Sequence, residues 1–240
     1  MFLALPFILI AVLFGLKGRN FIYKVCRIWS AIWYTTVGIS HQEILEVPHN
    51  KKKQYIFVAN HLSYLDIPPI VLSVRQPVRA LGKAEMVKMP IFGLVYRAAV
   101  IQVNRDNSSH RARSVRALKA AIHHGISIFI FPEGYLNYLK QPLKSFYDGA
   151  FRIAIETQTS IKPVLLIDSL DRMRYGELFT LTPGKNRVIF LEEISVEGLT
   201  INDLEHLKNK VYLIMEEKLK QYINYDELFK RIPPQIITHF

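Results

Sequence analysis

The chain of 240 residues contains a single cysteine, Cys26. One cysteine excludes an intramolecular disulfide framework and a zinc site built from several thiolates. Acidic residues are also scarce, because 20 Asp and Glu face 31 Lys and Arg, which gives a formal net charge of +11 with neutral histidines. This excess favours an anionic partner, such as nucleic acid, a lipid headgroup surface or a phosphorylated substrate. With 50% apolar and 21% charged residues, the chain is not of the disordered class.

Several motifs of common function classes are also missing. There is no G-x-S-x-G sequence, and Cys26 lies in a hydrophobic helical pattern with no base beside it, which disfavours a serine or cysteine lipid hydrolase. Zinc-finger spacing, a helix-turn-helix pattern and an aromatic–basic pattern of base readout are absent as well. We therefore expect no nucleic-acid partner.

Only one long hydrophobic run is present, Met1–Leu16, and it carries no charge. As a helix it would span about 24 Å, slightly less than a bilayer core of about 30 Å. Lys17 and Arg19 follow at once, whereas a secretory signal carries its charges before the apolar run. We predict an uncleaved membrane segment whose basic flank, like the rest of the chain, lies on the cytoplasmic side.

The next stretch, residues 21–39, predicts an amphipathic helix lying at the bilayer interface. The alternative is an ordinary helix packed on a domain. Residues 1–40 are thus expected to be membrane-anchoring helices, and residues 41–240 a soluble domain held at a surface. The proposed apolar face consists of Phe21, Val25, Ile28, Trp29 and Ile32, and the polar face of Lys24, Arg27 and Ser30.

Short runs rich in Val, Ile and Phe alternate with helical patterns in the remaining chain. This alternation favours an α/β domain with a mixed, mostly parallel central sheet flanked by helices. Predicted strands cover residues 55–59, 79–81, 99–103, 126–131, 161–167 and 187–191, and predicted helices cover residues 107–124, 148–157 and 202–223.

The loop after the first of these strands contains His61 and Asp66, separated by four residues. A turn could bring the two side chains together, and strand ends are where α/β sheets present catalytic groups. A carboxylate that accepts from one imidazole nitrogen leaves the other free to take a proton from a substrate hydroxyl. The alternatives are a structural histidine and a helix cap by Asp66, which precedes Pro68 closely.

A second candidate site is the sequence Phe131-Pro132-Glu133-Gly134 at the end of another apolar strand. A carboxylate at such a position needs a cleft or a partner. Glu133 could bind the hydroxyls of a polyol acceptor, and a backbone N–H near Gly134 could approach a developing oxyanion. The alternative is a simple turn that ends the strand.

A third feature is positive charge, because residues 75–119 contain ten Lys or Arg and only two acids. Arg105 follows a strand end, and its planar guanidinium suits a phosphate group. A basic helical face is either a solvated surface or a contact for lipid phosphates or an acidic acyl carrier. That face consists of Arg111, Arg113, Arg116 and Lys119.

Together these blocks resemble the glycerolipid acyltransferases typified by 1-acylglycerol-3-phosphate acyltransferase. The likeness covers residues 40–200, and the order of the blocks is more specific than any single one. The matching positions are Asn60-His61 with Asp66, then Lys83, Glu85, Pro90 and Gly93, then Arg105, then Phe131-Pro132-Glu133-Gly134, and finally Pro163-Val164.

The resemblance implies transfer of an acyl group from acyl-CoA or acyl carrier protein to a lysolipid hydroxyl. The excess of basic residues adds a bilayer with anionic headgroups as an expected partner. His61 would be the general base and Asp66 the residue that orients it. The acyl donor is a co-substrate, and the resemblance implies neither a metal nor a cofactor. The implied substrate-binding residues are Asn60, Ser63, Lys83, Arg105, Glu133 and Gly134.

The chain departs from the family pattern at two cationic positions. Tyr135-Leu136 stand where Thr-Arg is usual, and Tyr147 stands where a lysine follows Phe146. A charge-assisted hydrogen bond contributes about 1.5–3 kcal/mol, so these losses weaken a phosphate site unless Arg105 or Lys83 compensates. A lysolipid such as an N-acylated amino-acid lipid is therefore an alternative acceptor. A lipid-binding relative without catalysis is a further alternative, which the presence of both His61 and Asp66 disfavours.

Overall fold

The computed structural model describes residues 14–48, 50–88, 92–103, 108–137, 139, 141–173 and 181–230. Most of the predicted membrane segment Met1–Leu16 lies outside these residues. Among the helices in the described ranges, none has both the length and the apolar character that a membrane crossing requires.

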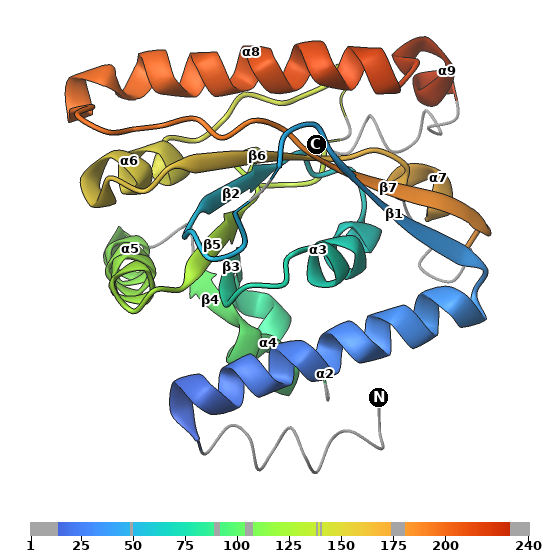
Figure 1. The fold of residues 1–240 in the computed structure, drawn as a ribbon, viewed down its shortest axis with the longest axis horizontal. Coiled ribbons are helices and arrows are strands. Elements are labelled where there is room, and N and C mark those ends of the chain that lie inside the picture. Colours follow the sequence, from blue (N-terminus) through green and yellow to red (C-terminus); the bar gives the residue numbers. More distant parts are fainter. Residues whose placement is uncertain are drawn as a thin grey trace.

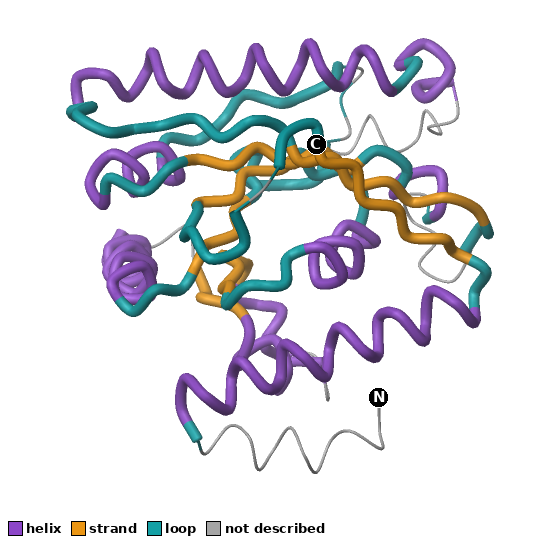
Figure 2. The backbone as a smooth tube through the Cα atoms, in the orientation of Figure 1, coloured by secondary structure: helices purple, strands orange, loops and turns teal. Residues whose placement is uncertain are grey.

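A seven-stranded sheet forms the centre of the molecule, with the strand order β1-β7-β6-β2-β5-β3-β4 (Figures 1 and 2). The five strands from β6 to β4 run parallel, and β1 and β7 run parallel to each other but antiparallel to β6. This arrangement confirms the predicted α/β class and the mixed, mostly parallel sheet. The strands are β1 (Ile39–Leu45), β2 (Ile56–Ala59), β3 (Val78–Lys83), β4 (Val100–Val103), β5 (Ser127–Ile130), β6 (Ile161–Leu166) and β7 (Gly184–Phe190).

Helices follow most of the strands and cover both faces of the sheet. Short 3₁₀ turns η2 (Tyr64–Asp66), η3 (Ala84–Lys88) and η4 (Ile201–Asp203) precede helices or end strands. The α-helices are α2 (Gly15–Thr36), α3 (Ile67–Ser73), α4 (Phe92–Ala99), α5 (Ser108–His123), α6 (Gly149–Thr157), α7 (Ser169–Arg172), α8 (Leu204–Tyr222) and α9 (Tyr225–Lys230).

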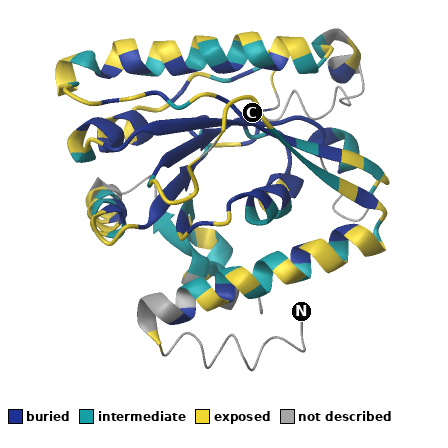
Figure 3. Ribbon diagram, in the orientation of Figure 1, coloured by how far each residue is buried: buried dark blue, intermediate teal, exposed yellow. Residues whose placement is uncertain are grey.

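The two faces of the sheet carry separate apolar clusters. On one face, α5, α6 and α8 pack against alternate residues of β2 and β5, with Leu118, Phe151 and Met215 among the buried side chains. On the other face, α2 and α3 cover an aromatic cluster that contains Phe57 and Phe129. Figure 3 shows the buried strands between these two helical layers. Both faces are therefore covered, and the polar groups that follow the strands lie where the strands end.

Helix α2 lies across α3 and α4 (Figure 1). Ile22, Ser30 and Tyr34 form its buried side. Ser30, which belongs to the predicted polar face, thus packs on the domain. By contrast, Phe21, Ile28 and Ile32 of the predicted apolar face are 47%, 61% and 58% exposed.

Candidate active site

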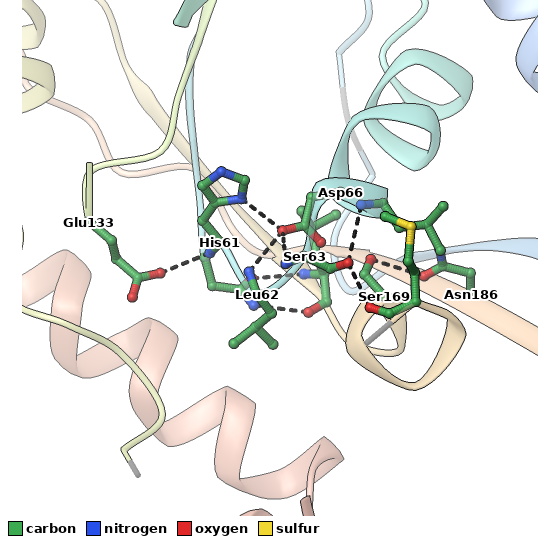
Figure 4. Close-up of polar contacts among 11 residues, drawn as sticks. His61, Leu62, Ser63, Asp66, Glu133, Ser169 and Asn186 are labelled. Carbon is green, nitrogen blue, oxygen red and sulfur yellow. Dashed lines mark hydrogen bonds and ion pairs between the residues drawn. The ribbon is translucent and has the colours of Figure 1, made fainter. Parts of the chain in front are cut away.

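His61 and Asp66 meet at the carboxyl end of β2 (Figure 4). His61 Nδ1 lies 2.8 Å from Asp66 Oδ2. The Asp66 side chain is fully buried, whereas the His61 side chain keeps 18% of its surface exposed. The pair thus has a buried carboxylate behind a ring that solutes can reach, which is the arrangement that a general base with an orienting partner requires.

The Asp66 carboxylate also organises the turn that presents His61. Its Oδ2 atom accepts the main-chain N–H groups of Leu62 at 2.8 Å and Ser63 at 2.9 Å. Asp66 precedes α3, yet its side chain makes no capping hydrogen bond to that helix. The alternative reading of Asp66 as the cap of the following helix is therefore not what the structure shows, since the carboxylate faces back into the His61 loop.

Asn60 and Ser63 make contacts with the protein's own main chain. Asn60 Nδ2 donates to Leu166 O at 2.9 Å, and Asn60 Oδ1 accepts Leu166 N–H at 2.8 Å. Ser63 Oγ donates to Met173 O at 3.0 Å and accepts from Leu65 N–H. Both side chains are buried, so they tie the His61 loop to β6 and to the end of α7. Both side chains therefore position the loop, and their expected contact with the substrate stays a prediction.

Glu133 lies beside the main chain of His61 and is 1% exposed. Its Oε1 accepts His61 N–H at 2.8 Å, and its Oε2 accepts Lys144 N–H at 2.8 Å. Burial raises the pKa of Glu133 to about 8, although both N–H groups favour the ionised form. The carboxylate therefore clamps the His61 loop to the Lys144 segment, and its expected contact with an acceptor hydroxyl stays a prediction.

Gly134 adopts a positive φ of 78°, as a tight turn at this point requires. Its N–H donates to Phe131 O at 3.1 Å. The motif thus forms a turn that ends the strand, which was the alternative interpretation. The Gly134 N–H makes a hydrogen bond inside this turn.

Two contacts to His61 were not predicted from the sequence. The Phe131 ring stacks on the His61 imidazole with a centroid distance of 3.9 Å and an interplanar angle of 13°. Asn137 N–H donates to His61 O at 2.7 Å. In the sequence, Phe131 stood out only as part of the Phe-Pro-Glu-Gly motif, and no sequence pattern pointed to Asn137. Ring stacking and loop closure depend on tertiary structure, which such patterns do not show.

The predicted cationic residues are only partly described. Lys83 ends β3 with an exposed side chain. The strands β3, β5 and β2 are parallel neighbours. Lys83 and His61 therefore both lie at the carboxyl ends of these strands. Arg105 lies outside the described residues. On α5, Arg113 and Arg116 are exposed, while Lys119 pairs with Glu156 at 2.6 Å.

Comparisons with known proteins place the chain among acyltransferases. The profile of the Acyltransferase family matches residues 39–167. A chloroplastic 1-acyl-sn-glycerol-3-phosphate acyltransferase of Arabidopsis thaliana is 27% identical over 79% of this chain and 52% of its own length. A lyso-ornithine lipid O-acyltransferase of Pseudomonas aeruginosa is 30% identical over 48% of this chain and 43% of its own length. The chain thus spans about half of each of these relatives.

The fold is also that of a solved relative. The crystal structure of the 1-acyl-sn-glycerophosphate acyltransferase PlsC from Thermotoga maritima matches with a TM-score of 0.68 and 22% identity, over 85% of this chain and 81% of that one. The profile match covers more than half of the chain and includes His61, Asp66 and Glu133. The protein belongs to the Acyltransferase family.

Proposed function

We propose that the protein is an O-acyltransferase that moves a fatty acyl group from acyl-CoA or acyl carrier protein to the hydroxyl of a lysolipid. The observation that carries the proposal is the 2.8 Å contact between His61 Nδ1 and the buried Oδ2 of Asp66. This contact holds the Nδ1–H tautomer, which leaves Nε2 with the lone pair that a base needs.

In the first step, Nε2 of His61 removes the proton of the acceptor hydroxyl, and the hydroxyl oxygen attacks the thioester carbonyl of the donor. The imidazolium that forms keeps its Nδ1–H on the Asp66 carboxylate. The tetrahedral intermediate then expels the thiolate, which takes the proton from Nε2. An ester and a free thiol result, and His61 returns to its starting state.

The phosphorylated acceptor 1-acylglycerol-3-phosphate is the first candidate substrate, and phosphatidic acid would be the product. It is supported by the order of the motifs and by the names of several relatives. A lysolipid with an amino-acid headgroup is the second candidate. It is supported by Tyr135-Leu136 and Tyr147 at positions where the family pattern has cations, and by the similarity to the lyso-ornithine enzyme.

The reaction is proposed to occur at an anionic membrane surface. Helix α2 turns Phe21, Ile28 and Ile32 outward, and Trp29 stacks on Trp33 with centroids 5.8 Å apart. Exposed apolar side chains with indole rings beside them favour the interfacial region of a bilayer. The excess of basic residues favours anionic headgroups in that bilayer.

The test is acyl transfer by the purified protein. Radiolabelled acyl-CoA and acyl carrier protein are each offered with lysophosphatidate, lyso-ornithine lipid and other lysolipids in mixed micelles. We expect a labelled diacyl product from at least one lysolipid. Release of free fatty acid without any acylated lipid would support a hydrolase, and donor that stays intact with every acceptor would contradict the proposal.

A further inference from the structure

A lysine and a tyrosine form a pair in the loop between β5 and α6, next to His61. Lys144 Nζ lies 5.6 Å from the centroid of the Tyr135 ring, the geometry of a cation–π contact. Tyr135 is 46% exposed, and Lys144 is half-buried. The pair therefore combines a half-buried lysine with a partly exposed aromatic ring.

The pair is tied to the main chain of His61 on two sides. The Glu133 carboxylate joins His61 N–H and Lys144 N–H, each at 2.8 Å. Tyr135 lies in sequence between Glu133 and Asn137, and Asn137 N–H donates to His61 O at 2.7 Å. Two of the segments that surround His61 thus also carry the lysine and the ring.

The charge of Lys144 is available to a ligand. In the described part of the chain, Lys144 has no carboxylate within ion-pair distance, whereas Lys208 of α8 pairs with Asp148 and Glu205. Glu133 contacts Lys144 through the main-chain N–H, and no ion pair joins its carboxylate to the Lys144 ammonium.

The position of this lysine matters because the chain lacks a cation that its motif normally carries. Leu136 stands where the pattern has arginine, and Tyr135 stands where it has threonine. We propose that Lys144, held on the Tyr135 ring, binds the anionic headgroup of the acceptor lysolipid. The ligand chemistry is a phosphate monoester or a carboxylate. The inference rests on the proposed function and adds to it the residue that selects a charged acceptor.

Lysine suits this task because its ammonium keeps N–H donors for an oxyanion while it lies over the ring. The aromatic face limits the number of positions that the ammonium occupies, which lowers the entropy lost on binding. A phosphate and a carboxylate both accept such donors.

The first experiment measures acceptor binding without a donor, so that turnover plays no part. Binding of lysophosphatidate, of lyso-ornithine lipid and of neutral monoacylglycerol to the whole chain is measured by calorimetry in non-ionic micelles. For the preferred anionic lipid, we expect Lys144→Ala to raise the dissociation constant about 10- to 100-fold, the loss of one charge-assisted hydrogen bond. Lys144→Arg should retain most of the affinity, and the neutral lipid should be affected little.

Matched variants separate local binding from general effects. Lys210→Ala removes an equal charge from an exposed position on α8 and should leave binding of the anionic lipid unchanged. Tyr135→Phe keeps the ring and should bind nearly as the parent protein does, whereas Tyr135→Leu should weaken anionic binding. The anionic lipid that loses affinity in Lys144→Ala identifies the headgroup as phosphate or carboxylate.

Kinetics provide the second readout. Together with binding, they distinguish a failure of the proposed acyltransferase function from a failure of the proposed role of Lys144. For Lys144→Ala, kcat/KM for the anionic lysolipid relative to monoacylglycerol should fall about 10- to 100-fold, mainly through KM. A parent protein that binds anionic lipid through Lys144 but transfers no acyl group would overturn the proposed function alone. Equal binding of the anionic lipid by the parent and Lys144→Ala, or equal losses for anionic and neutral lipids, would overturn the role of Lys144.

Discussion

Glu133 follows His61 by 72 positions in the chain, yet its carboxylate accepts the His61 main-chain N–H at 2.8 Å. Its other oxygen holds Lys144 N–H. The buried carboxylate thus fixes the backbone from which the His61 imidazole projects.

Burial of the Glu133 carboxyl makes stability depend on pH. Burial raises the pKa of Glu133 from its ordinary value of 4.5 to about 8, so the folded protein keeps a proton that the unfolded chain releases. The contribution of Glu133 to the free energy of unfolding therefore declines as pH rises from about 4.5 to about 8 and is constant above that range. Urea titrations between pH 5 and pH 9 should show this decline.

Glu133→Gln should remove that pH dependence, because an amide does not titrate. Its NH₂ group would also face one of the two main-chain N–H donors, so we expect about 1–3 kcal/mol lower stability near pH 5 and a reduced kcat. An unchanged pH slope would contradict the assignment of the proton to Glu133. A higher acceptor KM with unchanged kcat and stability would instead support direct binding of an acceptor hydroxyl.

The stack of Phe131 on His61 should assist catalysis. The two rings are nearly parallel, with centroids 3.9 Å apart, so the π face stabilises the imidazolium that forms when His61 takes a proton. Phe131→Leu should lower kcat about 2- to 30-fold with little change in KM, whereas Phe131→Tyr should retain activity.

Steady-state kinetics of the Phe131 variants need a control for loss of an aromatic side chain. Phe151→Leu provides one, because Phe151 is fully buried on the other face of the sheet. If Phe131→Leu and Phe151→Leu lose the same activity for the same loss of thermal stability, the stack has no specific role.

The bridge between Asn60 and Leu166 predicts a stability effect. Asn60 is fully buried and makes two hydrogen bonds, at 2.9 and 2.8 Å, to the main chain of Leu166. Asn60→Ala leaves a buried N–H and a buried C=O unpaired, which should lower the free energy of unfolding by about 2–5 kcal/mol in urea denaturation. A loss below 0.5 kcal/mol, about the effect of a surface substitution, would contradict the bridge.

The open face of α2 predicts membrane binding. Ile28 and Ile32 are 61% and 58% exposed, so replacing both with Asp should leave the fold intact while reducing sedimentation with anionic liposomes. Activity on lysolipid in micelles should be retained. Leu213→Asp, at a 60% exposed position of α8, is the control and should bind liposomes normally. Equal losses in both variants would exclude a specific role for α2.

The sequence predicted the sheet class and most of its elements because their signals are local. The predicted strand at residues 161–167 appears as β6 (Ile161–Leu166), and the predicted helix at residues 107–124 appears as α5 (Ser108–His123). By contrast, β1 was not predicted, because its polar sequence Ser40-His41-Gln42-Glu43 forms a strand only through pairing with β7. Edge strands of this kind depend on partners far along the chain.

In the candidate site, too, local contacts could be predicted from the sequence and contacts between distant segments could not. The contact of His61 with Asp66 followed from their spacing, because the intervening 3₁₀ turn closes the loop on itself. The main-chain contacts of Asn60, Ser63 and Glu133 did not follow, since each joins segments that are distant in the chain. A motif shows that a residue type is required at a position, but tertiary contacts decide whether it faces the ligand or the backbone.

The central claim is that His61 removes the proton of the acceptor hydroxyl. The most direct measurement is the turnover of His61→Ala with the preferred lysolipid and donor, beside the exposed control His206→Ala. We expect His61→Ala to lose about 10²- to 10⁴-fold in kcat while acceptor binding and thermal stability stay near those of the parent, and His206→Ala to remain fully active. Full turnover by a folded His61→Ala protein would contradict the account.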